Sequence, residues 1–247
     1  NSILRYFIEF SYNGTNYHGW QIQPNAITVQ EVINKNLSLL LKEEIYTIGA
    51  GRTDTGVHAK QMYAHFDSSS TFDLQLLAHK LNALLPKDVA IHQIIAVSTD
   101  AHARFDATSR TYQYHIHTQK NVFNKDLSWQ YLYPLEIFKM NQAAQLLLNF
   151  TDFQCFSKVH TDVNTFNCKI THAQWTVKNQ ELTFTITADR FLRNMVRAIV
   201  GTLVNVGLNK VSIPEFVSII ESKNRNKAGF SVPAHGLFLT EITYPYL

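Results

Sequence analysis

The stretch EIYTIGAGRTDTGVHAKQMYAHFD, residues 44–67, determines how the first half of this 247-residue chain is interpreted. Its two ends, EIYTIGA and QMYAHFD, each predict a short strand. Between them lies a glycine-rich loop in which Arg52 stands two residues before Asp54. The stretch therefore predicts two strands joined by a loop that presents an arginine and an aspartate.

The neighbouring segments extend this pattern to the order β-α-β-β-α-β. A helix is predicted from TVQEVINKNLSLLLKE (28–43), because Thr28 and Glu31 have the spacing of a capping box and apolar residues recur on one face. The other predicted elements are two strands and a helix that ends before a proline: ILRYFIEFSY (3–12), VAIHQIIAV (89–97) and LQLLAHKLNALL (74–85).

The second half repeats this order with one extra helix. SRTYQYHIHT predicts a strand, ITHAQWTVKNQELTFTITAD a hairpin and GLFLTEITYPY a last strand. The predicted helices are PLEIFKMNQAAQLLLNF (134–150), FLRNMVRAIVGTLVNVG (191–207) and IPEFVSIIESK (213–223). We therefore predict an α+β fold with two related βαββαβ-like halves, residues 1–104 and 105–247, around a central antiparallel sheet with an active-site cleft between them.

Composition limits the class of protein. A net charge of +3 is compatible with a polyanionic partner, and 16 Phe, 11 Tyr and 3 Trp are enough for a core with some rings left to stack on bases. The two cysteines form no CxxC motif, which fits a reduced, cytoplasmic protein. We expect no signal peptide in NSILRYFIEF, and no membrane segment, since the longest apolar run is interrupted by Gly201 and Asn205.

Other chemistries of such a loop fit the sequence poorly. Asp-Thr-Gly is the aspartic-protease triplet, but that reaction needs a second carboxylate, the chain has no second triplet, and Arg52 favours ionised Asp54. GAGRTD fails as a dinucleotide fingerprint, because Asp54 replaces the third glycine and the loop leads to a strand. The 11 histidines lack ligand spacing, so we expect no metal site. The plain alternative for Asp54 is a turn residue that bonds its own backbone.

Several stretches together resemble the tRNA pseudouridine synthase A family. In chain order these are YNGTNYHGWQIQP (12–24), TVQEVI (28–33), GAGRTDTGVHA (49–59), LNALLP (81–86), AHARFDATSRTYQY (101–114), DFQCF (152–156) and FLRNMVRAIVG (191–201). The resemblance implies the pseudouridine-synthase fold and isomerisation of uridine to pseudouridine at positions 38, 39 and 40 of the tRNA anticodon stem-loop. It also implies a homodimer that uses neither cofactor nor metal.

The resemblance also implies roles for individual residues. Asp54 matches the catalytic aspartate, which either attacks C1′ of the ribose or removes the C2′ proton. Arg197 matches the arginine that partners this carboxylate, and Arg52 matches the arginine that holds the flipped-out nucleotide. Tyr112 matches the tyrosine that stacks on the uracil, and Leu237 matches the leucine on the other side of the pocket.

Two other functions remain as alternatives. A tRNA-binding protein without activity would require a damaged motif, yet the matching residues are all present. An aspartate-dependent glycosidase acting on nucleosides would require a second carboxylate as general acid, and the loop offers none.

Arg190, Arg193 and Arg197 are predicted to lie close together on one side of a helix that is otherwise apolar, and so to line a cleft.

Overall fold

The structure, a computed structural model, describes residues 2–247, which form two compact units. Unit 1 comprises the residues up to Thr108 together with Phe238–Leu247, and unit 2 comprises Ser109–Leu237. The sequence predicts a division between residues 104 and 105, with the C-terminal strand in the second half. In the structure residues 238–247, which hold nearly all of that strand, belong to unit 1.

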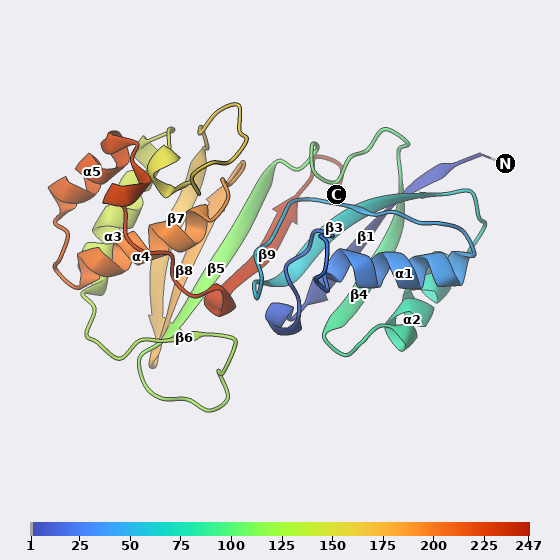
Figure 1. Cartoon of the computed structure of the whole chain (residues 1–247), viewed down its shortest axis with the longest axis horizontal. Coiled ribbons are helices and arrows are strands. Elements are labelled where there is room, and N and C mark those ends of the chain that lie inside the picture. Colours follow the sequence, from blue (N-terminus) through green and yellow to red (C-terminus); the bar gives the residue numbers. More distant parts are fainter. Residues whose placement is uncertain (1) are drawn as a thin grey trace. The chain divides into compact units, whose positions relative to one another are not determined.

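Unit 1 is a sheet with two α-helices beside it (Figure 1). Its elements are β1 (Leu4–Tyr12), α1 (Val29–Leu41), β2 (Ile48–Gly49), β3 (His58–Ser68), α2 (Leu74–Leu84), β4 (Val89–Val97) and β9 (Leu237–Thr243). The strands pair in the order β4-β1-β3-β9, and β2 also pairs with β3. Helix α1 contacts α2, and α2 contacts β4.

Local sequence explains where the helices of unit 1 begin. The Thr28 hydroxyl accepts a hydrogen bond from the backbone N–H of Glu31 (3.3 Å), and Asp73 caps α2 in the same way through Leu76 (2.8 Å). Lys42, in the left-handed region at φ 53°, ends α1. The buried face of α1 carries apolar residues at four-residue spacing: Val29, Ile33, Leu37 and Leu41.

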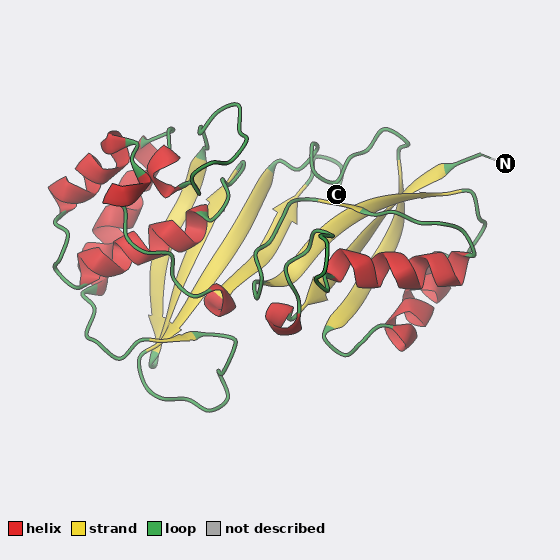
Figure 2. Ribbon diagram, in the orientation of Figure 1, coloured by secondary structure: helices red, strands yellow, loops and turns green. Residues whose placement is uncertain are grey.

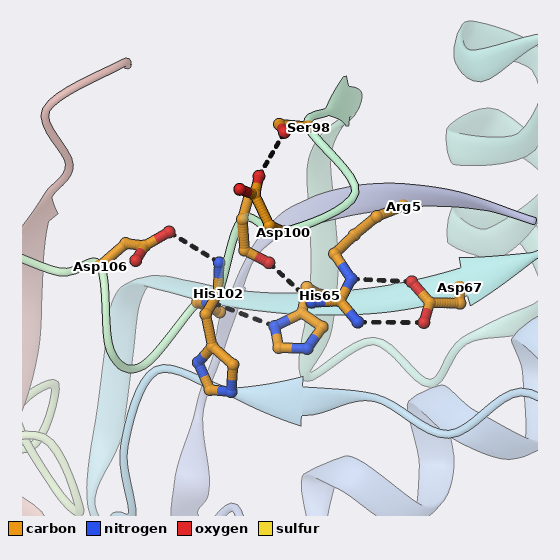
Figure 3. Close-up of polar contacts among 9 residues, drawn as sticks. Arg5, His65, Asp67, Ser98, Asp100, His102 and Asp106 are labelled. Carbon is orange, nitrogen blue, oxygen red and sulfur yellow. Dashed lines mark hydrogen bonds and ion pairs between the residues drawn. The ribbon is translucent and has the colours of Figure 1, made fainter.

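The segment after β4 is tied to β1 and β3 by polar contacts, as Figure 3 shows. The Arg5 guanidinium pairs with Asp67 (2.8 Å) and donates to the carbonyl of Ala101 (2.8 Å). His65 Nδ1, which is buried, accepts the backbone N–H of Ala103 (3.0 Å). The first part of the AHARFDATSR motif is therefore fixed to the sheet of unit 1.

Unit 2 places three helices beside its strands (Figure 2). Its elements are β5 (Ser109–His117), β6 (Trp129–Gln130), α3 (Ile137–Leu146), β7 (Ile170–Lys178), β8 (Glu181–Ala188), α4 (Met195–Gly207) and α5 (Ile213–Ser222). The strands pair in the order β5-β8-β7, with β6 beside β5. Helix α3 contacts β7, α4 and α5.

Short 3-10 helices complete the two units. They are Gly14–Asn16, Leu147–Asn149, Gln154–Phe156, Arg225–Lys227 and Ala234–Gly236. Of the helices within residues 2–247, none is long and apolar enough to cross a membrane.

The two halves are related in topology, as the sequence predicts. In unit 1 the first four strands pair in the order β4-β1-β3-β2. In unit 2 the order β5-β8-β7 repeats the order β1-β3-β2 when β5, β7 and β8 are matched to β1, β2 and β3. The predicted α+β class is confirmed. The pairing is mixed rather than antiparallel throughout, because β9 runs parallel to β3 and β6 runs parallel to β5.

The predicted arginine stripe is wrong. Helix α4 begins at Met195, because Asn194 has a left-handed backbone (φ 69°) that a right-handed helix cannot include. Arg190 and Arg193 therefore precede the helix, and Arg190 donates instead to the carbonyls of residues 165 and 167 (2.9 and 3.1 Å). Of the three arginines, only Arg197 lies on α4.

Candidate active site

Asp54 opens a tight turn in the loop between β2 and β3. Its carbonyl accepts the backbone N–H of Val57 (3.1 Å), and Gly56 has a φ of 84°. A hydrogen bond across four residues with a positive φ at the third is a type II turn, which favours glycine there. Asp54 is half-buried, whereas Arg52 is exposed. The loop thus carries an aspartate whose backbone is fixed in a turn and, two residues earlier, an exposed arginine.

The segment 12–20 supports this loop through two glycines. A Cβ atom on Gly14 would lie 1.9 Å from the carbonyl oxygen of Val57, and one on Gly19 would lie 2.2 Å from that of Thr53. Both contacts are with backbone, so neither can be relieved by a side-chain rotation. Glycine is required at these two positions because the segment and the loop pack backbone to backbone.

Hydrogen bonds join the same two pieces of chain. The hydroxyls of Tyr12 and Thr53 are 2.8 Å apart, and the backbone N–H of Gly56 donates to the carbonyl of Tyr17 (3.3 Å). The buried histidine at position 58 follows the loop, and its Nδ1 accepts the backbone N–H of Gly14 (2.9 Å). The turn that holds the aspartate is therefore fixed on both sides.

Tyr112 lies on β5 in unit 2, half-buried and opposite Ile186 of β8. Its ring meets the ring of Phe191 edge to face, with centroids 5.1 Å apart and planes at 89°. Such a contact restricts the orientation of both rings.

Arg197 is tied to the loop that follows α5. Its Nε donates to the carbonyl of Val232 (2.9 Å), and the backbone N–H of Val232 donates to the carbonyl of Arg197 (3.2 Å). A Cβ atom on Gly201 would lie 1.7 Å from the carbonyl oxygen of Phe230, so α4 and this loop also pack backbone to backbone. The guanidinium is therefore held by the helix and the loop together.

The same loop reaches β5 and then Leu237. The hydroxyl of Tyr114 donates to the carbonyl of Pro233 (2.8 Å), and a Cβ atom on Gly236 would lie 2.7 Å from the Tyr114 ring. Burial raises the pKa of Tyr114, and the charge of Arg197 opposes part of that rise. Leu237, which is buried, is the last residue of unit 2.

The predicted site residues thus fall into two sets. Arg52 and Asp54 share one loop of unit 1. In unit 2 the loop 230–237 ends in Leu237 and binds both Arg197 and the tyrosine that lies two residues after Tyr112 on β5.

Sequence reasoning missed the residues that support both sets. These are Gly14, Gly19, His58, Tyr114, Phe191 and Gly236. All but Gly236 lie inside stretches that carried the resemblance, so the motifs themselves were the available signal. A motif does not say, however, which part of the backbone each residue meets.

Comparison with known proteins extends the resemblance beyond the motifs. The family described as tRNA pseudouridine synthase matches residues 9–106 and 143–245 of the chain. A tRNA pseudouridine synthase A of Parabacteroides distasonis is 54% identical over 242 residues, which cover 98% of this chain and 96% of that protein.

Two further relatives carry the same name. The protein of Bacteroides fragilis is 53% identical, with 99% of this chain and 98% of that protein covered. The protein of Bacillus subtilis is 37% identical, with 98% of this chain and 99% of that protein covered. The similarity covers nearly the whole chain, which therefore belongs to the tRNA pseudouridine synthase family.

Proposed function

We propose that the protein isomerises uridine to pseudouridine in tRNA, at positions 38, 39 and 40 of the anticodon stem-loop. The observation that carries the proposal is the position of Asp54, a half-buried residue whose backbone forms a turn two residues after exposed Arg52, in a chain of this enzyme family. Relatives named tRNA pseudouridine synthase A support both the reaction and the substrate.

The reaction explains what a single carboxylate does. The bond from C1′ to N1 of the uracil breaks, the uracil turns in place, and C1′ joins C5. C5 gives up a proton and N1 gains one, so the mass of the RNA is unchanged. Asp54 either attacks C1′ or removes the C2′ proton, and both steps need its ionised form at the ribose.

The other residues bind the base and orient the carboxylate. Arg52, exposed on the same loop, holds the nucleotide that has left the stack, and a cation beside a π-face offsets part of the few kcal/mol that extrusion costs. Tyr112 stacks on the uracil, with its ring oriented by its edge-to-face neighbour. Arg197 partners the Asp54 carboxylate, and Leu237 lines the pocket on the other side of the base.

Mutation of the carboxylate tests the proposal. We expect Asp54→Asn and Asp54→Ala to abolish pseudouridine formation in tRNA, mapped at nucleotide resolution, while tRNA affinity changes little. Turnover by Asp54→Asn, with deamidation excluded by mass, would contradict the assignment. Release of free uracil by the native protein would instead identify a nucleoside glycosidase, because an isomerase keeps the base on the RNA.

The assembly and the compartment are part of the same proposal. A homodimer is expected from the family resemblance, and light scattering at working concentration should give twice the mass of one chain. A monomer under these conditions would overturn this part alone. The two cysteines, both buried and free, fit a reducing compartment, so the proposed location is the cytoplasm.

A further inference from the structure

Asp88, just before β4, binds the segment 12–20 at three points. Its Oδ1 accepts the hydroxyl of Tyr17 (2.6 Å), its Oδ2 accepts the side-chain amide of Asn16 (3.4 Å), and its carbonyl accepts the backbone N–H of Asn13 (2.9 Å). One residue thus holds the chain on both sides of Gly14. No motif in the sequence pointed to Asp88.

Tyr17 connects this anchor to the turn that holds Asp54. Its side chain is 5% exposed, and its hydroxyl donates to Asp88 while its carbonyl accepts the backbone N–H of Gly56. Burial, and then the hydrogen bond to Asp88, raise the pKa of Tyr17, so the phenol keeps the proton that it donates. Gly56 is the third residue of the turn that Asp54 opens.

The packing of the segment against the loop transmits any displacement. The two glycines of the segment lie too close to the loop backbone for any side chain, so a shift of the segment moves the backbone on both sides of Asp54. Because the Tyr17 phenol is bonded to Asp88, it limits how far the segment can move. The path from Asp88 to Asp54 therefore runs through the phenol, the N–H of residue 56 and the turn itself.

We propose that Asp88 and Tyr17 are positioning residues for Asp54, which set the place of its carboxylate through the segment 12–20. The proposal rests on the proposed function in one respect, since it takes Asp54 as the group that meets the ribose. It adds two residues on which the rate of the chemical step depends. Neither of them contacts the substrate. A displacement of about 1 Å at a reacting group can cost on the order of 100-fold in rate.

Single-turnover rates with pre-bound tRNA test the pair. Tyr17→Phe keeps the ring and removes the donor, and Asp88→Ala removes the acceptor. Both should slow pseudouridine formation by about 10- to 100-fold, with tRNA affinity nearly unchanged. Asp88→Asn keeps an oxygen that can accept the phenol hydrogen bond and should retain most of the rate, which separates the hydrogen bond from the charge.

A matched control removes general effects on stability. The side chain of Asn82 bonds the backbone N–H and carbonyl of Ile91 on β4 (2.7 and 2.9 Å), near Asp88 in sequence. Asn82→Ala should lower the unfolding temperature and leave the single-turnover rate near the native value. A native rate in both Tyr17→Phe and Asp88→Ala overturns the proposal, and so does an equal loss of rate in Asn82→Ala.

Hydrogen exchange separates this proposal from the proposed function. The backbone N–H groups of Gly56 and Val57 should exchange faster in Tyr17→Phe and Asp88→Ala than in Asn82→Ala, whatever the protein catalyses. If the native protein makes no pseudouridine, the proposed function fails, while faster exchange still supports control of the turn by this pair. Unchanged exchange overturns that control even if the native protein is active.

Discussion

Gly19→Ala should destabilise the protein by about 2–5 kcal/mol and disturb the turn that holds Asp54. Gly19 has a φ of 79°, a region in which a residue with a side chain is strained. A Cβ atom there would also lie 2.2 Å from the carbonyl oxygen of Thr53, the residue before Asp54. Two separate effects therefore oppose the substitution.

The magnitude is the sum of these two costs. A left-handed backbone costs a residue with a side chain about 1–2 kcal/mol. Overpacking costs about 1–3 kcal/mol, and here the crowding atom is a backbone oxygen, which no side-chain rotation can move away. The total is a large part of the roughly 5–15 kcal/mol by which a folded protein is stable.

Urea denaturation of Gly19→Ala beside Asn179→Ala checks this reasoning. Asn179 has a φ of 57° in the exposed turn between β7 and β8, so its replacement by alanine tests the backbone cost without adding a Cβ atom. We expect Asn179→Ala to lose about 1 kcal/mol. If Gly19→Ala loses no more than this control, the close approach to Thr53 has no energetic consequence and the account of the turn is wrong.

Three further predictions concern the base, the pH and the salt. If the Tyr112 hydroxyl relays the C5 proton, Tyr112→Phe should lose most single-turnover activity with binding intact, whereas Tyr112→Ala should also bind more weakly, by about 1–3 kcal/mol. Near-native turnover in Tyr112→Phe would leave only stacking. Burial, and then the Arg5 charge, lower the pKa of His65 from 6.5 to about 4. As the pH falls from 6.5 to about 4, His65 is therefore protonated in the unfolded chain before it is protonated in the folded protein, and about 3 kcal/mol of stability should be lost. His65→Asn should flatten this part of the profile in urea denaturation, and an unchanged profile would contradict the account. Affinity for tRNA should fall steeply with salt in binding titrations, and a flat titration would exclude binding through phosphate contacts.

Elements with strong local signals could be predicted from the sequence. β4 has the predicted bounds, 89–97, and the predicted hairpin 170–189 is β7 and β8, with its turn at Asn179. In these stretches β-branched and aromatic residues favour strands, and Asn179 suits the left-handed turn between β7 and β8. β6 was missed, because two residues paired with β5 leave no periodic pattern.

The start of α4 shows where local signals fail. FLRNMVRAIVG has a helical distribution of apolar residues from Phe191 onward, yet the helix begins at Met195. Phe191 packs against Tyr112 instead, and Arg190 bonds to backbone carbonyls outside the helix. Asparagine tolerates the left-handed conformation better than most residues, but a sequence does not say at which asparagine the chain uses it.

Glycines at the candidate site mark the limit of sequence reasoning most clearly. Arg52 and Asp54 are neighbours in the chain, so a motif can present them together. Gly14 and Gly236 are required by contacts with residues 57 and 114, each distant in sequence. A glycine in a motif indicates that space is needed, but it does not identify the atom that takes up the space. The motif YNGTNYHGW therefore predicts turns, and only the structure shows that these turns hold the backbone around Asp54 in place.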